Sequence, residues 1–381
     1  MPLHASNLRE EIRQQALALG LDVAGFAPPV PPPHHESLLP WLAEGRQAGM
    51  AWLARNPARR QNPTSHLPDL ATILVVGINC RPPGNPLDYL QDASRLGIAS
   101  YARHGDYHLI LQDKCRALIS WLNHRLGQQV NHRIMVDWGA VMEKPLAVAA
   151  GLGWQGKHAL LVNRQHGSWL HLAELLLPIP LAPDTPSRDH CGSCTRCQTA
   201  CPTLALERAY SLDTRLCLAY HTVENPGSIP RPLRPLLANR VFGCDDCLVA
   251  CPWNRFAPLC QQPELLPQGY NRPEYLLDYV GLDESQFLQL FQGTPLIRPG
   301  WQRFLRNLAV ALGNWPHEQS IIALQQLLSS PFPLVREHAV WGLGHLFHAG
   351  WSLGEEALHR LNETEQDENV LQELAWALTG S

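Results

Sequence analysis

The 381-residue chain has few charged residues, no long hydrophobic run and little net charge. Charged side chains make up 17% of it, below the roughly 25% usual in globular proteins, and the formal net charge is −4. This balance excludes a polycation that coats nucleic acid or acidic membranes non-specifically. The most apolar stretch, residues 170–181, is interrupted by His171, Glu174 and two prolines, whereas a bilayer requires about 20 apolar residues. The sequence therefore predicts no transmembrane segment.

The first 20 residues lack the apolar core of a signal peptide, because Arg9, Glu10, Glu11 and Arg13 interrupt them. We therefore expect a cytoplasmic protein. Thiols are kept reduced in the cytosol, so the 11 cysteines are not expected to form structural disulfides. Metal ligation becomes the leading use for them.

The chain is long enough for two or three domains, and its first part alternates helical and strand patterns. Helical spacing continues up to Gly20, and residues 107–126 have the same periodicity. Buried strands are expected at residues 21–27, 72–79 and 132–137. Such alternation favours strands covered by helices, so we predict an α/β domain over residues 1–182.

Two further domains are predicted after the first. Residues 183–260 are rich in Cys, Pro, Arg and Asp and have little periodicity, which is typical of a small fold held by metal. Residues 261–381 are predicted to be all-α, and a short pattern recurs there at Ala309–Gly313, Val340–Gly344 and Ala375–Thr379. The spacing fits a shortened version of HEAT-like helical hairpins, whose period is near 40 residues. An ordinary helical bundle is the alternative.

The strongest chemical signal is a pair of cysteine runs. The run Cys191-x2-Cys194-x2-Cys197-x3-Cys201-Pro202 has the bacterial ferredoxin spacing, in which the fourth cysteine ligates the other cluster. The second run is Cys244-x2-Cys247-x3-Cys251-Pro252. Two [4Fe–4S] clusters need eight thiolates, and the runs supply seven. Spacing alone does not decide between Cys217 and Cys260 for the eighth, but Cys217 lies between the runs and is our choice.

Zinc is the alternative to iron and sulfur at these cysteines. Zinc sites usually pair two CxxC units across a longer spacer, so the doubled tight run favours clusters. The predicted cluster ligands are therefore Cys191, Cys194, Cys197, Cys251, Cys201, Cys217, Cys244 and Cys247. Cys80 and Cys115 are expected to be buried thiols and Cys260 a spare one.

Two clusters relay electrons but do not define a substrate. No GxGxxG follows a predicted strand, and the chain contains no Walker motif, so nicotinamide binding and nucleotide hydrolysis are unsupported. Asp106-Tyr107-His108 begins the cobalamin-binding pattern DxHxxG, but Leu111 stands in the place of its glycine. These patterns alone leave the electron acceptor unnamed.

Several longer sequence motifs are also present, and together they extend over nearly the whole chain. They are Met50–Arg55, Ser100–Arg103 with Asp106–His108, Val136–Asp137 with Glu143–Ala147, and Gly151–Lys157; the most specific are Asn239–Cys247 and Cys251–Asn254. In these motifs the chain resembles the epoxyqueuosine reductases, a family of iron–sulfur enzymes that use cobalamin to complete queuosine on tRNA.

The resemblance implies that an epoxide at the tRNA wobble position becomes an alkene, with two electrons and two protons entering and water leaving. It implies cobalamin in the N-terminal α/β domain, reduced by a ferredoxin-like double [4Fe–4S] module. It also implies an aspartate proton donor, which matches Asp137. Asp137 follows Ile134–Val136 at the end of a predicted strand, and we expect Trp138 to desolvate its carboxyl and raise its pKa to suit proton donation.

Only a few of the family's cobalamin-contacting side chains can be assigned to positions in this sequence. This sequence departs from the family's usual pattern at His104, Trp138 and Ala140, in the lining of the expected pocket. The predicted cobalamin contacts are Arg60, Tyr101, Asp137, Lys157 and Ser168.

Binding to tRNA requires a local basic surface on this weakly acidic chain. Arginines cluster in and beside the cysteine module, at Arg188, Arg196, Arg208, Arg215, Arg231, Arg234, Arg240 and Arg255. Guanidinium groups bind phosphates bidentately, so we predict that Arg231, Arg234 and Arg240 bind the anticodon stem-loop. The HEAT-like domain would extend that surface. We also expect an external electron donor and a monomer.

Two other functions fit some of these features. A cobalamin-dependent reductive dehalogenase pairs the same cofactors but normally carries a twin-arginine export signal, which is not visible here. A ferredoxin-type electron carrier needs no catalytic domain, and nearly 190 residues ahead of the clusters are too many for it.

Overall fold

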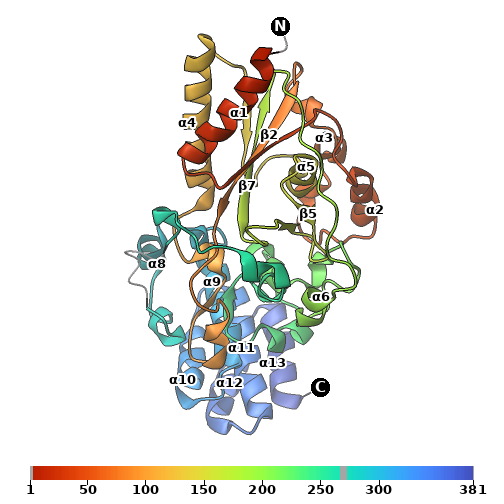
Figure 1. Ribbon diagram of the computed structural model, residues 1–381. Coiled ribbons are helices and arrows are strands. Elements are labelled where there is room, and N and C mark those ends of the chain that lie inside the picture. The colour runs from red at the N-terminus through yellow and green to blue at the C-terminus, as the bar shows by residue number, and fades with distance from the viewer. Residues whose placement is uncertain (1–2, 267–272, 381) are drawn as a thin grey trace. The chain divides into compact units, whose positions relative to one another are not determined.

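The computed structural model describes residues 3–266 and 273–380 (Figure 1). The chain divides into two compact units, each made of separate segments. Unit 1 comprises Met1–Gly84, His104–Thr214 and Asp246–Gln268, and unit 2 comprises Asn85–Arg103, Arg215–Asp245 and Gly269–Ser381. These units do not follow the predicted boundaries at residues 182 and 260. The difference arises because residues 97–98 pair as a strand with residues 240–242, which places both segments in unit 2.

Unit 1 contains an antiparallel sheet with the strand order β1-β2-β7-β4. The strands are β1 (Val23–Ala27), β2 (Thr72–Asn79), β7 (Leu170–Leu177) and β4 (Arg133–Met135). Strand β2 has the predicted bounds and is buried at all eight positions, which fits its β-branched composition. Strand β4 is shorter than the predicted 132–137 and ends before Asp137.

Helices cover both faces of this sheet, as predicted. In Figure 1, α1 (Leu3–Ala18) and α4 (Tyr107–Leu126) lie together on one side, and α5 (Glu143–Ala149) lies on the other. Helix α4 has the predicted bounds because Asp106 caps its first turn and Gly127, with a φ of 67°, ends it. The shorter elements of unit 1 are α2 (Leu38–Ala43), α3 (Pro57–Gln61), β5 (Trp154–Gln155), β6 (Leu161–Val162), α6 (Arg196–Ala200) and α7 (Asp246–Val249).

Unit 2 is mainly helical. The strands β3 (Gly97–Ile98) and β8 (Arg240–Phe242) form a parallel pair. Its helices are α8 (Glu284–Phe291), α9 (Trp301–Gly313), α10 (Glu318–Leu327), α11 (Pro333–His348), α12 (Glu355–Asn362) and α13 (Glu368–Thr379). In the part of the chain that the structure describes, no helix has the length and apolar character needed to cross a membrane.

The recurring C-terminal sequence pattern marks the contacts between helices α9, α11 and α13. A Cβ atom added at Gly313 would lie 2.6 Å from the Cα of Gly342, and one added at Gly344 would lie 2.5 Å from the Cβ of Ala377. Small residues therefore let the three helices pack closely, and α10 and α12 connect them in turn. This arrangement supports the HEAT-like interpretation, which stays a proposal.

A carboxyl group is buried in the centre of the unit 1 sheet. Glu174 on β7 is 0% exposed, and neither of its carboxyl oxygens has a hydrogen-bond partner among the described residues. It lies opposite Val75 on β2 and Met135 on β4. Burial, followed by the nearby charge of Glu143, raises the pKa of Glu174 well above its ordinary value. Folding therefore favours the protonated form of Glu174.

The Glu174→Gln variant should change the pH dependence of stability. Unfolding releases the Glu174 proton, so the free energy of unfolding should fall by about 1.4 kcal/mol per pH unit above about pH 4.3, until the raised folded pKa is reached. Glutamine cannot ionise and removes this slope. Thermal melting under anaerobic conditions should therefore show the variant's Tm rising relative to the wild type between about pH 5 and pH 8.

A matched control is Glu365→Gln in unit 2. The hydrogen bond from Arg336 lowers the pKa of Glu365 to about 2. Its stabilisation is thus complete above the unfolded pKa of about 4.3 and is lost only as the pH falls toward the folded value. The control should show a constant Tm difference over the same range. A constant difference for Glu174→Gln as well would mean that Glu174 is ionised.

Candidate active site and cluster centre

Asp137 lies in a tight turn between β4 and α5. Its φ of 59° is in the left-handed region, which aspartate and asparagine tolerate better than most residues. The main-chain N–H of Asp137 donates a hydrogen bond of 2.6 Å to Glu143 Oε1 at the start of α5. Lys144 Nζ in turn donates to Glu143 Oε2 at 3.0 Å. The turn is thus fixed by a charged side chain of the helix that follows it.

The start of α4 supplies the partners of the Asp137 carboxylate. Tyr107 Oη donates to Asp137 Oδ2 at 2.8 Å, and His108 Nε2 lies 3.4 Å from the same oxygen. The other ring nitrogen of His108, Nδ1, donates to Asp106 Oδ1 at 2.6 Å. Asp106 also accepts a hydrogen bond from the His108 main-chain N–H at 3.0 Å. His108 is therefore held between two carboxylates.

These contacts overturn the expectation of a raised pKa at Asp137. Burial alone would raise the pKa of Asp137, but the hydrogen bond from His108, the charge of Lys144 and the hydrogen bond from Tyr107 together lower it well below its usual range. Burial would likewise lower the pKa of His108, but Asp106 and Asp137 outweigh this effect and raise it to about 9. At neutral pH the pair is a carboxylate and an imidazolium.

Trp138 lies beside His108, the imidazole that contacts Asp137. Its ring stacks on His108, with centroids 5.3 Å apart, and 54% of the residue is exposed. The stack continues from His108 to Tyr107 and from Tyr107 to His171 on β7, with 4.0 Å between centroids at each step. Burial, followed by the influence of His104, lowers the pKa of His171 to about 3, so this ring is neutral. Asp137 itself is 37% exposed and remains accessible to a substrate.

Four of the predicted cluster ligands come together within unit 1. Cys191 and Cys194 lie on the loop that enters α6, and Cys197 lies in its first turn. Cys251 follows α7, which packs against α6. The sulfurs are close enough to influence one another's charge, Cys251 acting on Cys197 and Cys194 on Cys251. Among the described residues no three His, Cys, Asp or Glu side chains converge as ligands of one metal ion would. The ferredoxin spacing of the run still predicts that these four sulfurs hold one [4Fe–4S] cluster.

Two predicted cobalamin contacts, Lys157 and Ser168, also touch these cysteine loops, and their contact with cobalamin stays a prediction. Lys157 Nζ donates to the main-chain oxygens of Gly192 and Cys194 at 2.7 and 2.9 Å. The Ser168 hydroxyl hydrogen-bonds to the sulfur of Cys251 and lies 3.2 Å from His158 Nε2. Both side chains therefore hold the cysteine loops in place.

The remaining predicted cysteines are not all in one unit. Cys201 and Cys247 belong to unit 1, and Cys217 and Cys244 belong to unit 2, so the second quartet stays a prediction. Cys260 is 4% exposed, and burial raises the pKa of its thiol; its role as a spare cysteine stays a prediction. Cys80 and Cys115 are also buried.

The other predicted cobalamin contacts lie in different units. Arg60 on α3 donates to the main-chain oxygen of Gly139, in the same turn as Asp137, at 3.4 Å. Tyr101 belongs to unit 2, where its ring packs 5.9 Å from that of Phe242. Arg60 is thus placed beside Asp137, and the role of Tyr101 stays a prediction.

The predicted phosphate-binding arginines need correction. Arg234 is 2% exposed and forms ion pairs with Glu337 at 2.7 Å and Glu373 at 3.2 Å, and Arg240 is 3% exposed. Neither guanidinium is on the surface to meet a phosphate. Arg231 is partly exposed, but it also pairs with Glu373 and lies over the ring of Trp376. Sequence alone does not reveal this burial, because the glutamates lie more than 100 residues further along the chain.

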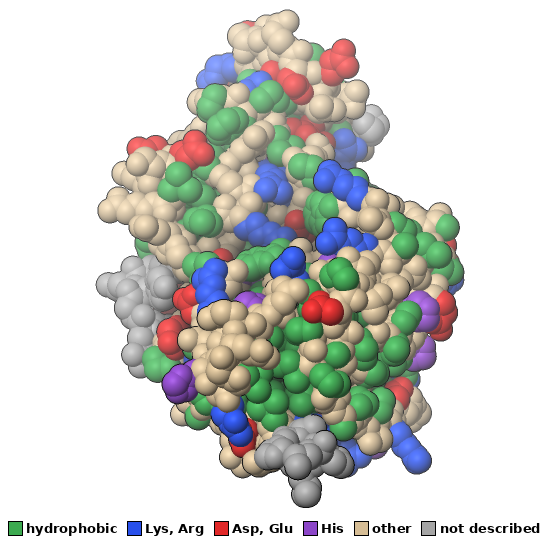
Figure 2. All heavy atoms as spheres, turned by 90° about the horizontal axis from the view of Figure 1, so that it is seen from above, with side chains coloured by type: hydrophobic (Ala, Val, Ile, Leu, Met, Phe, Trp, Pro, Cys, Tyr) green, Lys and Arg blue, Asp and Glu red, His purple; other side chains and the backbone are tan. Residues whose placement is uncertain are grey.

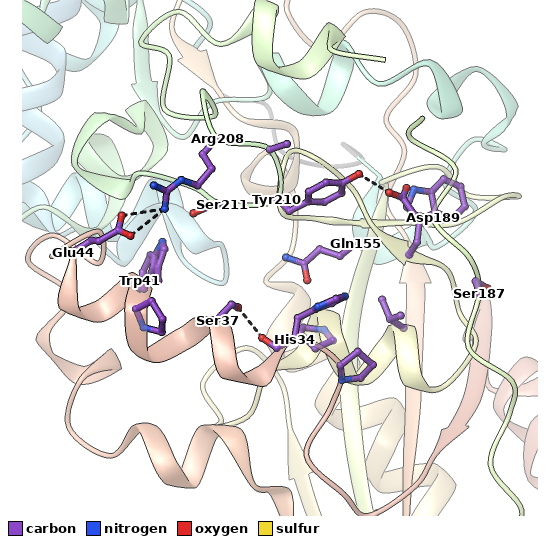
Figure 3. Close-up of a pocket in the computed structure, with 16 residues that line it drawn as sticks. His34, Ser37, Trp41, Glu44, Gln155, Ser187, Asp189, Arg208, Tyr210 and Ser211 are labelled. Atoms are coloured by element: carbon purple, nitrogen blue, oxygen red, sulfur yellow. Dashed lines mark hydrogen bonds and ion pairs between the residues drawn. The ribbon is translucent and has the colours of Figure 1, made fainter. Parts of the chain in front are cut away.

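A pocket of about 620 Å³ lies in unit 1 between α2, α5, β5 and residues 187–211. Figure 3 shows Trp41 and Glu44 on one side, Asp189 on the other and Gln155 between them. Glu44 pairs with Arg208 at 3.0 Å, and Tyr210 donates to Asp189, which also accepts from the Cys191 main-chain N–H. The pocket wall is therefore tied directly to the cysteine loop.

Comparisons with known proteins identify the family. The family model "Epoxyqueuosine reductase QueG, DUF1730" matches residues 60–137, and the model "4Fe-4S double cluster binding domain" matches residues 190–254. The epoxyqueuosine reductase of Salmonella typhimurium is 36% identical over 343 residues, which cover 90% of this chain and 89% of that protein. This chain belongs to the epoxyqueuosine reductase family. The Pseudomonas aeruginosa member is also 36% identical, covering 90% of this chain and 95% of its own.

Solved structures of epoxyqueuosine reductases have the same fold. One, determined with an epoxyqueuosine-modified tyrosine tRNA stem loop, has a TM-score of 0.89 and 26% identity and covers 98% of both chains. Another, from Streptococcus thermophilus, has a TM-score of 0.87 and 27% identity, covering 98% of this chain and 99% of its own. The double-cluster match contains all eight predicted cysteines and ends before Cys260.

Sequence reasoning missed the side chains around Asp137. The motifs that carried the family resemblance contain all four of these side chains: Tyr107, His108, Glu143 and Lys144. The sequence therefore held a signal for them. The motifs could not show that the start of α4 and the start of α5 meet at one carboxylate, because His108 and Asp137 are 29 residues apart in the sequence.

The cysteine geometry predicts different outcomes for two substitutions. Cys251→Ser should remove one cluster, so that reconstituted protein holds about four irons per chain in place of about eight. Cys260→Ser is the matched control and should retain full iron, because Cys260 is a buried thiol outside the double-cluster match. Iron analysis after anaerobic reconstitution measures both. Iron loss in the Cys260 variant alone would reverse the assignment.

A second prediction concerns Arg234. Arg234→Ala should lower stability by about 3–5 kcal/mol, because it leaves Glu337 and Glu373 buried without their partner. Arg360→Ala is the control: Arg360 is 66% exposed, and its pair with Glu356 on α12 should be worth about 0.5 kcal/mol or less. Thermal melting gives the comparison. If Arg234→Ala leaves Tm unchanged but reduces the salt dependence of tRNA binding, the buried pair is not the role of Arg234.

Proposed function

We propose that this protein reduces epoxyqueuosine to queuosine at the wobble position of tRNA. Membership of the family supports the reaction, and the related enzyme solved with an epoxyqueuosine-modified stem loop supports tRNA as the substrate. The observation that carries the proposal is the exposed Asp137 carboxylate, held between Tyr107 and His108 in the same unit as four grouped cysteines. A proton-transfer site and an electron-transfer centre thereby belong to one folded unit.

We further propose cobalamin as the cofactor that takes electrons from the clusters. Cobalamin is a large ring with amide side arms, so its site must combine apolar surface with polar side chains. The unit 1 pocket has such a mixed lining, including Trp41 and Gln155. Helix α5 connects it to the turn of Asp137, because Pro145 and Val148 line the pocket while Glu143 binds the turn. When bound, cobalamin would supply the two electrons that reduce the epoxide carbon.

The chain's own residues have distinct tasks in this proposal. Asp137 meets the epoxide oxygen, and Tyr107 orients its carboxylate through the hydrogen bond to Oδ2. Glu143 and Lys144 hold the turn that presents Asp137. Arg60 is our candidate for a cobalamin contact beside that turn, and Tyr101 stays a candidate in unit 2. Lys157 and Ser168 stay candidates for contact with cobalamin, and both also hold the cysteine loops in place.

Substrate binding and electron supply complete the proposal. Basic side chains other than Arg234 and Arg240 must hold the tRNA phosphates, and Figure 2 shows Lys and Arg side chains at the surface on the face that it draws. An external electron donor would reduce the clusters again after each turnover. We propose that the protein works as a monomer in the cytoplasm, where tRNA is modified. Epoxyqueuosine should accumulate in the tRNA of cells that lack the protein, as nucleoside mass analysis would show.

The Asp137→Asn variant tests the catalytic assignment. Asparagine tolerates the positive φ and can still accept the Tyr107 hydrogen bond, but it cannot pass on a proton. With pre-reduced enzyme, single-turnover conversion of epoxyqueuosine should fall by at least about 10²-fold, while iron content and tRNA affinity stay unchanged. Pre-reduction matters because steady-state turnover can be limited by electron supply.

The matched control is Asp113→Asn on α4. The Asp113 side chain is 74% exposed, so this variant should convert substrate at the wild-type rate. Wild-type conversion by Asp137→Asn would show that the proton comes from elsewhere.

A further inference from the structure

The proposed reaction needs two protons, but the resting site stores none on Asp137. Its carboxylate is surrounded by Tyr107, His108 and the charge of Lys144, which all favour the ionised form. A carboxylate cannot protonate an epoxide oxygen until it has itself received a proton. A protonated neighbour of Asp137 can supply that proton.

His108 is the neighbour with a proton to give. Its Nε2 lies 3.4 Å from Asp137 Oδ2, the oxygen that also accepts from Tyr107. On the far side of the ring, Nδ1 donates to Asp106 Oδ1 at 2.6 Å. The His108 side chain is 11% exposed and lies between the rings of Tyr107 and Trp138, so its orientation toward Asp137 is fixed.

We propose that His108 supplies the proton that Asp137 passes to the epoxide oxygen, and that Asp106 is the positioning residue that keeps His108 charged and oriented. This inference rests on the proposed function and adds a second and a third residue to its proton path. The line Asp106–His108–Asp137 joins the first turn of α4 to the turn after β4.

Groups on every neighbouring element act on the His108 charge. Asp106 and Tyr107 face it from its own segment, and Asp137 faces it from the turn after β4. Behind Tyr107, the His171 ring on β7 is neutral, and His104 and Lys144 add positive influence on His171. Glu143 offsets Lys144, since the two form an ion pair at 3.0 Å. The two carboxylates in contact with His108 outweigh these positive groups.

The proton path balances with the two-electron reduction. As the carbon–oxygen bond of the epoxide breaks, the oxygen becomes a stronger base than either Asp137 or His108. The Nε2 proton of His108 moves to the Asp137 carboxylate, and Asp137 passes that proton on to the epoxide oxygen. Neutral His108 then regains a proton from solvent, and the pair delivers the second proton that lets the hydroxyl leave as water. The two electrons come from the reduced cofactor, so no further reductant is needed.

The first experiment measures the His108 charge without any turnover. Histidine-selective labelling and NMR titration of the oxidised holoenzyme should show one ring that titrates near pH 9. That signal should be missing in His108→Gln. In Asp106→Asn it should move to lower pH by about 1–3 units, because one opposite charge is lost. A His108 signal that titrates near its ordinary value of about 6.5 would overturn the proposal, whatever the enzyme does to its substrate.

The second experiment follows single-turnover rate against pH with pre-reduced enzyme and epoxyqueuosine-modified tRNA. The wild-type rate should be level at neutral pH and fall above about pH 9, as His108 loses its proton. Asp106→Asn should keep the low-pH rate but shift the falling limb to lower pH, by the same amount as its NMR titration. His108→Gln should lose about 10²-fold at neutral pH and show no such limb.

Two outcomes separate this proposal from the proposed function. If wild-type enzyme converts epoxyqueuosine and the falling limb stays in place in Asp106→Asn, the proton path is wrong and the function stands. If the wild type converts no epoxyqueuosine, the function is wrong, and the NMR titration still decides whether His108 holds the proton. Asp113→Asn on the same helix serves as the control and should match the wild type in both experiments, because its exposed side chain is remote from the pair.

Discussion

The hydrogen bond from the Asp137 main-chain N–H to Glu143 determines how the active site is built. It closes the turn between β4 and α5, and it holds Asp137 at a positive φ. A carboxylate as the acceptor makes this bond stronger than one to a neutral group. With the turn closed, the Asp137 side chain meets Tyr107 and His108 at the start of α4, from the opposite side of the sheet to α5. One short contact thus brings helices from both faces of the sheet to a single carboxylate.

Two carboxyl groups in unit 1 show how strongly surroundings decide charge. Glu174 lies in the apolar centre of the sheet without a hydrogen-bond partner among the described residues, and its pKa is raised. Asp137 lies at the end of the neighbouring strand, among donors and positive charges, and it loses its proton. Desolvation acts on both groups in the same direction, so the hydrogen bonds make the difference. Proton donation by Asp137 therefore depends on its partners and not on burial.

Local sequence patterns predicted the parts of this fold that local interactions control. The β-branched run over residues 72–79 and the capped periodic helix over 107–126 have the predicted bounds, and the ferredoxin spacing brought out the cysteine runs. The charge states of Asp137 and Arg234 could not be predicted in the same way. They depend on His108, Glu337 and Glu373, which are distant in sequence and become neighbours only through packing. Burial of Arg234 and Arg240 likewise follows from tertiary contacts that composition does not reveal.

The four grouped cysteines of unit 1 are widely spread in the sequence, and this has a consequence for how the protein matures. Three of the four sulfurs lie within seven residues, but Cys251 comes 54 residues after Cys197. A ribosome must therefore deliver most of the cysteine segment before a four-thiolate site can exist. Closing so long a loop costs conformational entropy, which binding of the cluster would offset. A cluster held by the predicted quartet would therefore also stabilise the contact between α6 and α7.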